Sequence, residues 1–230
     1  MEPTEESLRS NLRAVRAGIE TACGLVGRDP AKVLLVAASK SVPVPTITSA
    51  LHVGITDFGE NYVSELRAKH ASAPTARWHF IGTLQGSGAH HVAALADVVQ
   101  TIAGGRATDR LSRRAAEAGR IIDALIEVDF TGERSGISPQ DAPALADRVA
   151  EMAGLRLIGL MTIPAFTTEA EDARPTFAKL RDLRDRIARD HPEVLELSMG
   201  MSLDYEVAVE EGATMVRVGT ALFGPRAPLA

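Results

Sequence analysis

The chain of 230 residues lacks the features that mark disulfide-bonded, thiolate-ligated or membrane-spanning proteins. Its one cysteine, Cys23, can form neither an intrachain disulfide nor a cluster of thiolate metal ligands by itself. No apolar run reaches the length of about 18 residues that spans a bilayer, and the acidic N-terminal segment MEPTEES lacks the apolar core of a secretory signal. We therefore expect a soluble, cytoplasmic protein that does not bind membranes.

Positive charge is also scarce. The chain has 25 Lys and Arg against 30 Asp and Glu, with a formal net charge of −5. A general nucleic-acid binder needs clustered positive charge on one face, so we expect no nucleic-acid partner. No linker rich in Ser, Gly or Pro divides the sequence, which predicts a single domain over residues 1–230.

Lysine is the rarest of the basic residues, since the chain has only Lys32, Lys40, Lys69 and Lys179. Lys40 ends the stretch VLLVAASK at 33–40, a short apolar run typical of a buried strand with a lysine at its C-terminal tip. A primary amine can form a Schiff base, whereas a guanidinium cannot. The alternative at this point is a lysine that only leaves the core for water.

The chain opens with an amphipathic helix and then alternates strand-like with helix-like segments. Apolar residues recur at three- and four-residue spacing over 5–25, with acidic residues at the start. Short apolar runs follow near 33–38, 55–58, 78–82, 97–102, 121–128, 155–160, 194–197 and 213–218. Such alternation predicts an α/β fold with parallel strands, and eight units favour a closed (β/α)₈ TIM barrel with an extra N-terminal helix over an open doubly wound sheet.

The helix predicted near 168–190 has the clearest end signals. Thr168 and Glu171 form a capping-box pattern, and His191-Pro192 stops the helix. Pro175 conflicts with that start, because proline removes a backbone donor, so it either bends the helix or marks its true first turn.

In a barrel, chemistry belongs at the C-terminal ends of the strands. Two segments near the end of the chain, VLELSMGMS at 194–202 and MVRVGTALFG at 215–224, each run from a strand through glycine into a helix, which suits a phosphate. The alternative is two ordinary tight turns.

Arg217 alternates with valines in the last strand, where a charge is costly unless paired, so we expect it to point toward the barrel mouth and meet an acceptor. A structural pair with a carboxylate is the alternative.

Several motifs together resemble one family. They are VAASKSVP, FGENYVSEL, WHFIGTLQ, LRLIGLMTIP and LSMGMSLDYEVAVEEGATMVRVGTALFGPR. The sequence is similar over residues 8–226 to the YggS/PROSC family of pyridoxal 5′-phosphate (PLP) homeostasis proteins. The resemblance implies a barrel of the alanine racemase N-terminal type.

The resemblance also implies a set of cofactor-binding residues. Lys40 would hold PLP as a Schiff base, and Arg217 would face the pyridine nitrogen. Ser198, Met199, Gly200, Gly219 and Thr220 match the phosphate-binding segments. Asn61 and His79 match motif residues near the cofactor, Arg134 matches a basic residue near its phenolic oxygen, and Met161 ends a strand at the same face.

The sequence departs from the family pattern at 83–91. Where family members read close to GHLQSNK, this chain has Gly82-Thr83-Leu84-Gln85-Gly86-Ser87-Gly88 and then His90-His91. A flexible turn is the favoured interpretation of Gly86-Ser87-Gly88, and a new phosphate loop is the alternative.

Two features favour a carrier over an enzyme. A protonated arginine at the pyridine nitrogen weakens PLP as an electron sink. Racemisation also needs an acid or base on each face of the substrate carbon, which in racemases comes partly from a further domain. We therefore expect a monomeric PLP-binding protein of vitamin B6 homeostasis that binds and releases PLP, with PLP-dependent apoenzymes as candidate partners. One alternative is a small racemase-like enzyme that recruits its second base from a partner or from Tyr62 or Tyr205. Another is a barrel that binds a different phosphorylated metabolite.

Overall fold

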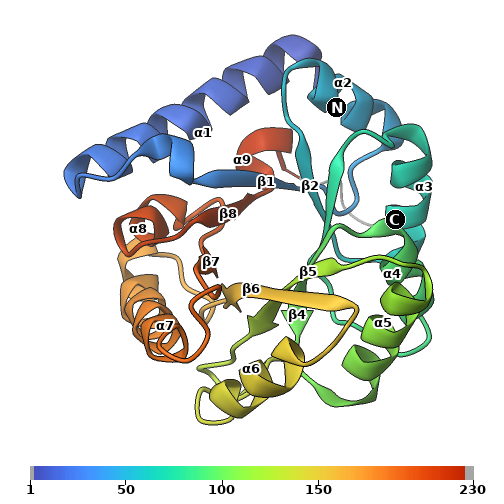
Figure 1. Cartoon of the computed structure of the whole chain (residues 1–230). Helices are drawn as coiled ribbons and strands as arrows, with labels where there is room; N and C mark the ends of the chain where they lie inside the picture. Colours follow the sequence, from blue (N-terminus) through green and yellow to red (C-terminus); the bar gives the residue numbers. More distant parts are fainter. Residues whose placement is uncertain (1–2, 226–230) are drawn as a thin grey trace.

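Eight parallel strands form a closed barrel in the computed structural model, which describes residues 3–225 (Figure 1). Each strand pairs with its neighbours in the sequence, and the last strand pairs with the first. The strands are β1 (Leu34–Ala38), β2 (Asp57–Glu60), β3 (Arg77–Phe80), β4 (Val98–Ile102), β5 (Ile122–Glu127), β6 (Leu155–Met161), β7 (Glu196–Ser198) and β8 (Met215–Val218). The predicted (β/α)₈ barrel is thereby confirmed, and the open doubly wound sheet is excluded.

Helices surround the barrel and connect successive strands, as parallel pairing requires (Figure 1). They are α1 (Glu5–Leu25), α2 (Val44–His52), α3 (Val63–Ser72), α4 (Ala89–Leu95), α5 (Gly105–Glu117), α6 (Ala142–Ala150), α7 (Arg174–Ile187), α8 (Tyr205–Glu210) and α9 (Thr220–Phe223), with 3₁₀ turns η1 (Pro30–Lys32) and η2 (Ala170–Ala173).

Pairing of β1 with β8 closes the ring. Val36 is aligned with Arg217 and Ala37 with Val218, and the backbone amide of Leu34 donates to the Thr214 carbonyl at 2.7 Å. The beginning and end of the barrel sequence therefore lie side by side. The loops that follow β1 and β8 therefore leave neighbouring strands at the same end of the barrel.

Side chains alternate between two hydrophobic regions. The large core lies between the strands and the helices and includes Phe58, Trp78 and Phe177, all fully buried. A smaller apolar cluster of Val98, Leu125, Met161 and Met215 fills the inside of the barrel. The barrel is thus packed through its middle, which leaves its two ends for ligands.

Helix α1 matches its predicted bounds and packs along the flank of the barrel. Thr4 caps it, because the Thr4 hydroxyl accepts a hydrogen bond from the Ser7 amide at 3.2 Å. Its buried residues, Leu8 among them, contact α8 and α9, so the helix covers the region where the barrel closes. Helix α1 also borders the N-terminal end of the barrel through Leu12 and Ile19.

The start of α7 differs from the sequence prediction. The helix begins at Arg174 rather than near residue 168, and η2 precedes it. Pro175 lies in the first turn of α7, where its missing amide costs nothing. The Thr168–Glu171 capping box was therefore wrong. The neighbouring Thr167 forms the local contact instead, as its hydroxyl donates to the Asp172 carboxylate at 2.6 Å.

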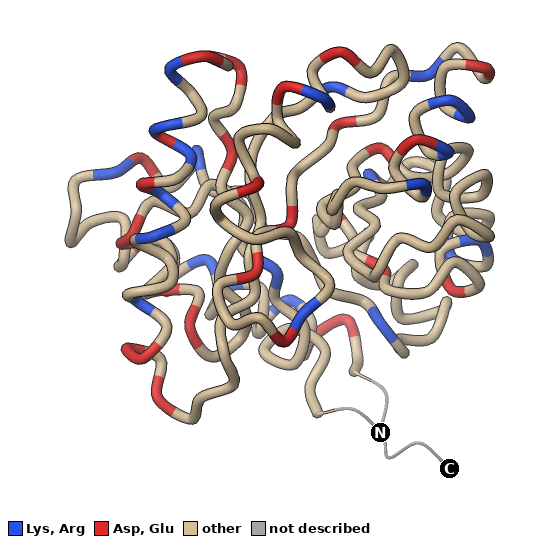
Figure 2. Tube along the Cα trace, turned by 90° about the horizontal axis from the view of Figure 1, so that it is seen from below, with Lys and Arg blue, Asp and Glu red and all other residues tan. Residues whose placement is uncertain are grey.

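Acidic and basic residues are interspersed along the chain trace (Figure 2). Within residues 3–225, we find no helix that combines the length and the apolar character needed to cross a membrane.

Replacing Leu8 by alanine tests the role of α1. Leu8 is fully buried, so Leu8→Ala should lower the free energy of unfolding by about 2–5 kcal/mol, through lost burial and the cavity left behind. Leu25 on the same helix is 72% exposed, and Leu25→Ala should change the free energy of unfolding by less than about 0.5 kcal/mol. Urea unfolding measures both, and equal effects would contradict the packing of α1 on the barrel.

Candidate functional site

Lys40 lies at the rim formed by the C-terminal ends of the strands. It is two residues beyond the end of β1 and is half-buried. Since β1 pairs with β8, Lys40 and the turn formed by Gly219 and Thr220 follow neighbouring strands at the same end of the barrel. Its Nζ is 5.5 Å from the centre of the Tyr62 ring, a distance within the range of a cation–π contact. Tyr62 precedes α3 and is 50% exposed, so the amine and the ring face the same opening.

Side chains hold the turn around Lys40. The Ser39 hydroxyl donates to Glu60 Oε1 at 2.6 Å, and the Ser41 amide donates to Glu65 Oε2 at 2.8 Å. Ser41 has φ of 62°, and it is the only non-glycine residue of the range 3–225 with positive φ. This backbone conformation is costly, so the surrounding contacts must favour it.

A buried lysine links these contacts. Lys69 Nζ donates to the Ser39 carbonyl at 2.7 Å and to both Glu60 Oε1 and Glu65 Oε2 at 2.6 Å. An ammonium group has three donors, so every one is used. Burial raises the pKa of Glu60, against the opposing hydrogen bond from Lys69. The other oxygen of Glu60, Oε2, is buried and has no hydrogen-bond partner within the described part of the chain.

Arg217 lies inside the barrel below the mouth. Its Nη1 donates to the Ser198 hydroxyl at 2.6 Å, and its Nη2 donates to the Thr162 carbonyl at 2.9 Å. Burial lowers the pKa of Arg217 to about 10, while Asp204 and Glu127 raise it, so the guanidinium stays protonated at neutral pH. No carboxylate oxygen of residues 3–225 forms a salt bridge with it, so the expected acceptors are neutral groups.

The turn after β8 is built around a residue that the sequence reasoning missed. The Ser202 hydroxyl oxygen accepts hydrogen bonds from the Gly219 amide at 3.1 Å and the Ala221 amide at 3.3 Å. Ser202 therefore joins the loop after β7 to the first turn of α9. The signal was present, since Ser202 is the second serine of the SMGMS segment, but only the pairing of β7 with β8 shows that the two turns meet.

Gly200 in the same loop has no room for a side chain. Its φ is 91°, and a Cβ atom there would lie 2.5 Å from the Ala208 Cβ. Its carbonyl accepts from the Arg217 amide at 2.9 Å, which ties the loop after β7 to β8.

The other predicted residues of this region point in different directions. Ser198 is fully buried inside the barrel, where its hydroxyl contacts Arg217 and Gln100. Met199 is buried in the outer core, and Met161 belongs to the inner cluster. The structure therefore brings Lys40, Arg217 and the Gly219–Thr220 turn to one end of the barrel, with Ser198 beneath.

Asn61 and Arg134 lie in loops at that same end. Asn61 follows β2, and its backbone oxygen would be 2.0 Å from a Cβ atom on Gly82, so the two turns touch. Arg134 follows β5 and donates from Nη2 to the Pro164 carbonyl at 3.1 Å, which joins the loops after β5 and β6.

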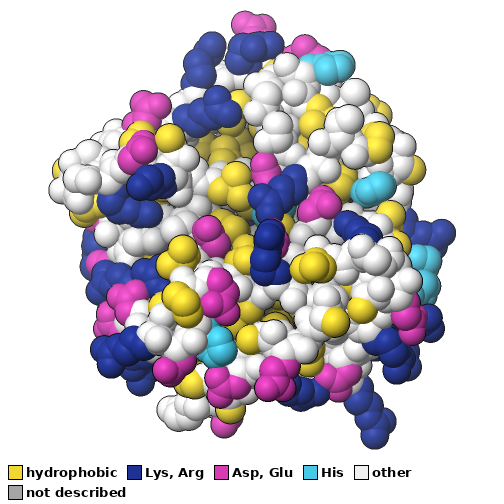
Figure 3. Space-filling model, in the orientation of Figure 1, with side chains coloured by type: hydrophobic (Ala, Val, Ile, Leu, Met, Phe, Trp, Pro, Cys, Tyr) yellow, Lys and Arg dark blue, Asp and Glu magenta, His cyan; other side chains and the backbone are white. Residues whose placement is uncertain are grey.

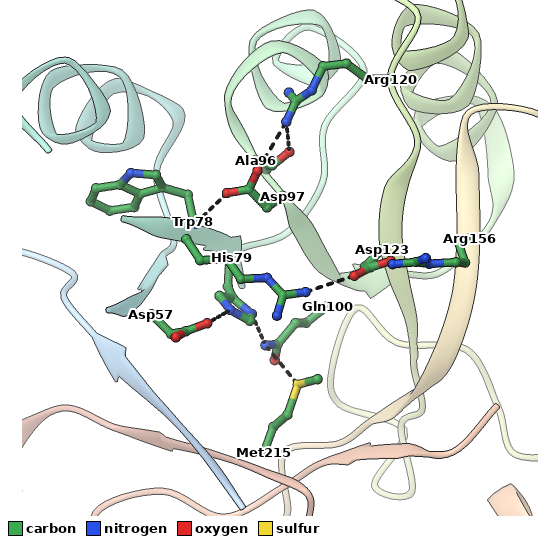
Figure 4. Close-up of polar contacts among 11 residues, drawn as sticks. Asp57, Trp78, His79, Ala96, Asp97, Gln100, Arg120, Asp123, Arg156 and Met215 are labelled. Carbon is green, nitrogen blue, oxygen red and sulfur yellow. Dashed lines mark hydrogen bonds and ion pairs between the residues drawn. The ribbon is translucent and has the colours of Figure 1, made fainter. Parts of the chain in front are cut away.

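His79 is fully buried between the two ends of the barrel (Figure 4). Its Nε2 is 3.1 Å from Asp57 Oδ1, and its Nδ1 is 2.9 Å from Gln100 Nε2. Burial lowers the pKa of His79, against the opposing hydrogen bond and charge of Asp57. The ring touches Asp57 and Gln100, so its connection to the mouth runs through Gln100.

The divergent segment forms a turn before α4. Gly86, Ser87 and Gly88 are in a turn conformation, and Gly88 directly precedes the helix. A hollow of about 640 Å³ lies between this segment and the residues Asn61 and Tyr62.

The opposite end of the barrel carries a larger cavity. It has a volume of about 770 Å³ and lies against α1, where Figure 3 shows a hollow with hydrophobic side chains inside it. Ion pairs border it, because Asp123 accepts from Arg77 at 2.9 Å and from Arg156 at 2.6 Å. None of the predicted site residues lines this cavity.

Removing the buried lysine tests how the Lys40 turn is held. Lys69→Met would leave Glu60 and Glu65 without their counter-ion, so we expect the free energy of unfolding to fall by about 3–5 kcal/mol at neutral pH. The loss should shrink in acid, where Glu60 takes up a proton. Urea unfolding at neutral pH and in acid measures the two losses of free energy. Lys179→Met on the exposed face of α7 is the matched control, and an equally small effect at both positions would rule out the buried cluster as a support.

The lowered pKa of His79 predicts that the stability of the fold depends on pH. Its pKa is lowered in the folded state, so below about pH 6.5 the unfolded chain binds a proton that the barrel does not. The free energy of unfolding should therefore fall as pH drops from 6.5 toward 5, by up to about 1.4 kcal/mol per pH unit from this residue.

The matched comparison is His79→Gln over the same pH range. Carboxylates away from His79, such as Glu60, contribute equally to both proteins, so the difference between the two slopes reports His79 together with its partner Asp57. Parallel slopes in urea unfolding would show that His79 does not resist protonation.

Comparisons with known proteins agree with this geometry. The family model "Alanine racemase, N-terminal domain" matches residues 7–227. The chain is 38% identical over 220 residues to the pyridoxal phosphate homeostasis protein of Aquifex aeolicus, covering 94% of this chain and 96% of the relative. It is 39% identical over 224 residues to the protein of that name from Pseudomonas aeruginosa, with 96% of each chain covered.

A solved structure is similar over the same length. PipY of Synechococcus elongatus PCC7942, with PLP bound, superposes with a TM-score of 0.84 at 32% identity, covering 94% of this chain and 100% of PipY. The likeness in sequence and in fold thus extends over nearly the whole chain. The chain belongs to the pyridoxal phosphate homeostasis protein family, and its barrel is of the alanine racemase N-terminal type.

Proposed function

We propose that this protein binds pyridoxal 5′-phosphate and takes part in its intracellular homeostasis, with Lys40 as the residue that holds the aldehyde as a Schiff base. The observation that carries the proposal is the position of Lys40 just past the C-terminal end of β1, the strand that pairs with β8, at the same end of the barrel as the turn after β8 and Arg217. PipY, whose solved structure contains PLP, is 32% identical to this chain.

The residues at the mouth fit the three chemical parts of PLP. The aldehyde requires a primary amine, and Lys40 is half-exposed whereas Lys69 is buried with all its donors used. The phosphate requires amides and hydroxyls, and the turn that Ser202 holds through the Gly219 amide carries the amide and hydroxyl of Thr220 at the start of α9. The pyridine nitrogen requires a polar partner, for which Arg217 is placed inside the barrel.

Arg217 also bears on catalysis. PLP catalyses reactions by withdrawing electrons from a substrate carbon, which works best when its pyridine nitrogen carries a proton. An arginine with a pKa of about 10 keeps its own proton at neutral pH and offers only donors. We therefore propose a carrier that binds and releases PLP without strong catalytic activity.

The positions of the two tyrosines favour the carrier over a racemase. The Tyr205 hydroxyl donates to Glu206 at 3.0 Å and lies against Gly18 of α1, in the outer layer. Tyr62 is at the mouth, but it presents its ring to the Lys40 amine. Neither hydroxyl is thus set as the second acid or base that racemisation requires.

The proposal also covers the oligomeric state, the compartment and the partners of the protein. We propose a monomeric, cytoplasmic, single-domain carrier that supplies PLP to PLP-dependent apoenzymes. Its net charge of −5 offers no general site for nucleic acid.

Lys40→Ala tests the proposed function directly. Wild-type protein incubated with PLP should show the absorbance band of a Schiff base and, after borohydride reduction and digestion, a pyridoxyl group on Lys40. Lys40→Ala should lose both signals, because the exposed Lys32 and Lys179 lack the surrounding site. Spectra and peptide mass analysis provide the measurement.

Lys179→Ala is the matched control and should keep both signals. A colourless wild type, or an adduct at another lysine, would contradict the proposal. Sustained, Lys40-dependent racemisation of an L-amino acid, followed by circular dichroism, would favour the enzyme over the carrier.

A further inference from the structure

A chain of hydrogen bonds crosses the inside of the barrel from Asp57 to Arg217. His79 lies between Asp57 and Gln100, as Figure 4 shows. The Ser198 hydroxyl donates to Gln100 Oε1 at 2.6 Å and accepts from Arg217 Nη1 at 2.6 Å. All five side chains are buried, and they come from β2, β3, β4, β7 and β8.

The partners at each end fix the direction of every bond in this chain. The Asp57 carboxylate only accepts, since its pKa is lowered by hydrogen bonds from His79 and Thr56 that outweigh its burial. His79 must therefore carry its proton on Nε2, and its Nδ1 must accept. Gln100 then turns its amide NH₂ group toward His79, with the Met215 sulfur 4.0 Å from the same nitrogen.

The amide oxygen of Gln100 consequently faces Ser198. This oxygen takes the Ser198 hydroxyl proton, so the lone pairs of the Ser198 oxygen are left for the guanidinium. If the amide were reversed, the Ser198 oxygen would accept from both the amide NH₂ group and the guanidinium, and the hydroxyl proton would lose Gln100 as its acceptor. The amide oxygen of Gln100 therefore fixes the rotation of the Ser198 hydroxyl and directs its lone pairs at Arg217.

We infer that Gln100 is a positioning residue for Arg217, acting through Ser198, so that the guanidinium faces the mouth of the barrel. The inference rests on the proposed function only in that Arg217 is taken to meet PLP there. Neither Gln100 nor its partner His79 needs to touch the cofactor for this role.

Neutral acceptors matter because two carboxylates attract the charge of Arg217. Arg217 lowers the pKa of both Glu127 and Asp204, although burial raises the pKa of each overall. The hydrogen bonds to Ser198 and to the Thr162 carbonyl hold the guanidinium against the attraction of these two carboxylates.

A double-mutant cycle tests the coupling. Gln100→Leu and Ser198→Ala should each weaken PLP binding about tenfold, as expected for loss of one hydrogen-bonded support of a charged group. The double variant should also bind about tenfold more weakly than wild type, because both changes break the same path. PLP titration followed by absorbance measures the four proteins. Losses that multiply to about a hundredfold, or wild-type binding by Gln100→Leu, would overturn the inference.

Ser112→Ala is the control for loss of a buried hydroxyl. Ser112 accepts from the Gly154 amide at 3.3 Å, outside the barrel, so this variant should bind PLP like wild type. A loss equal to that of Ser198→Ala would mean that any buried deletion has this effect, and would overturn the inference.

The donor and acceptor assignment along the hydrogen bonds from Asp57 to Arg217 can be tested without PLP. NMR of protein labelled at histidine with ¹⁵N should show His79 neutral and protonated on Nε2. Gln100→Glu places a carboxylate oxygen against Nδ1, so the pKa of His79 should rise clearly in that variant. A proton on Nδ1 in the wild type, or an unchanged titration in Gln100→Glu, would overturn the inference.

The two proposals fail in different ways. If the wild type binds no PLP, the proposed function fails, while the NMR result still decides which atoms donate and accept in the hydrogen bonds from Asp57 to Arg217. If the wild type binds PLP through Lys40 but the cycle is additive, only the role of Gln100 fails.

Discussion

The pairing of β1 with β8 is the constraint on which the site depends. It aligns Val36 with Arg217 and brings the residues after β1 beside the residues after β8, although about 180 residues separate them in the sequence. In an open sheet these strands would not pair with each other, and the amine would lie far from the glycine turn. The barrel therefore creates the site by its closure, and α1, packed over α8 and α9, covers the joint.

Two buried cations are held in contrasting ways. Lys69 meets two carboxylates and a carbonyl, so its charge is neutralised locally and its role is to hold the Lys40 turn. Arg217 meets a hydroxyl and a carbonyl, so its charge is oriented but not neutralised. A buried charge without a carboxylate partner is expensive, and proteins keep such charges where a ligand needs them. This contrast separates the supporting cation from the one that we propose to face the cofactor.

Much of the fold could be predicted from periodicity, because α1 and the eight apolar strands each bury one face or both. Lys40 and Arg217 could be singled out because a charge at the end of a buried strand is rare. The Ser202 contact and the Asp57–Arg217 chain could not, since they join residues of different strands whose neighbourhood only the closed barrel defines. The capping box failed for a local reason: Pro175 suits a first helical turn, and that preference placed the start of α7 at Arg174.

Because Lys69 is buried and uses all three of its N–H donors, it should react differently from the other lysines with chemical reagents. Acylating reagents attack an amine only through its unprotonated, accessible form, and the Lys69 ammonium is buried with every N–H committed. The folded chain thus offers Lys32, Lys40 and Lys179 to such a reagent, and the unfolded chain offers a fourth amine. Tryptic peptides that contain Lys69 are therefore a built-in reporter of opening around β2 and α3.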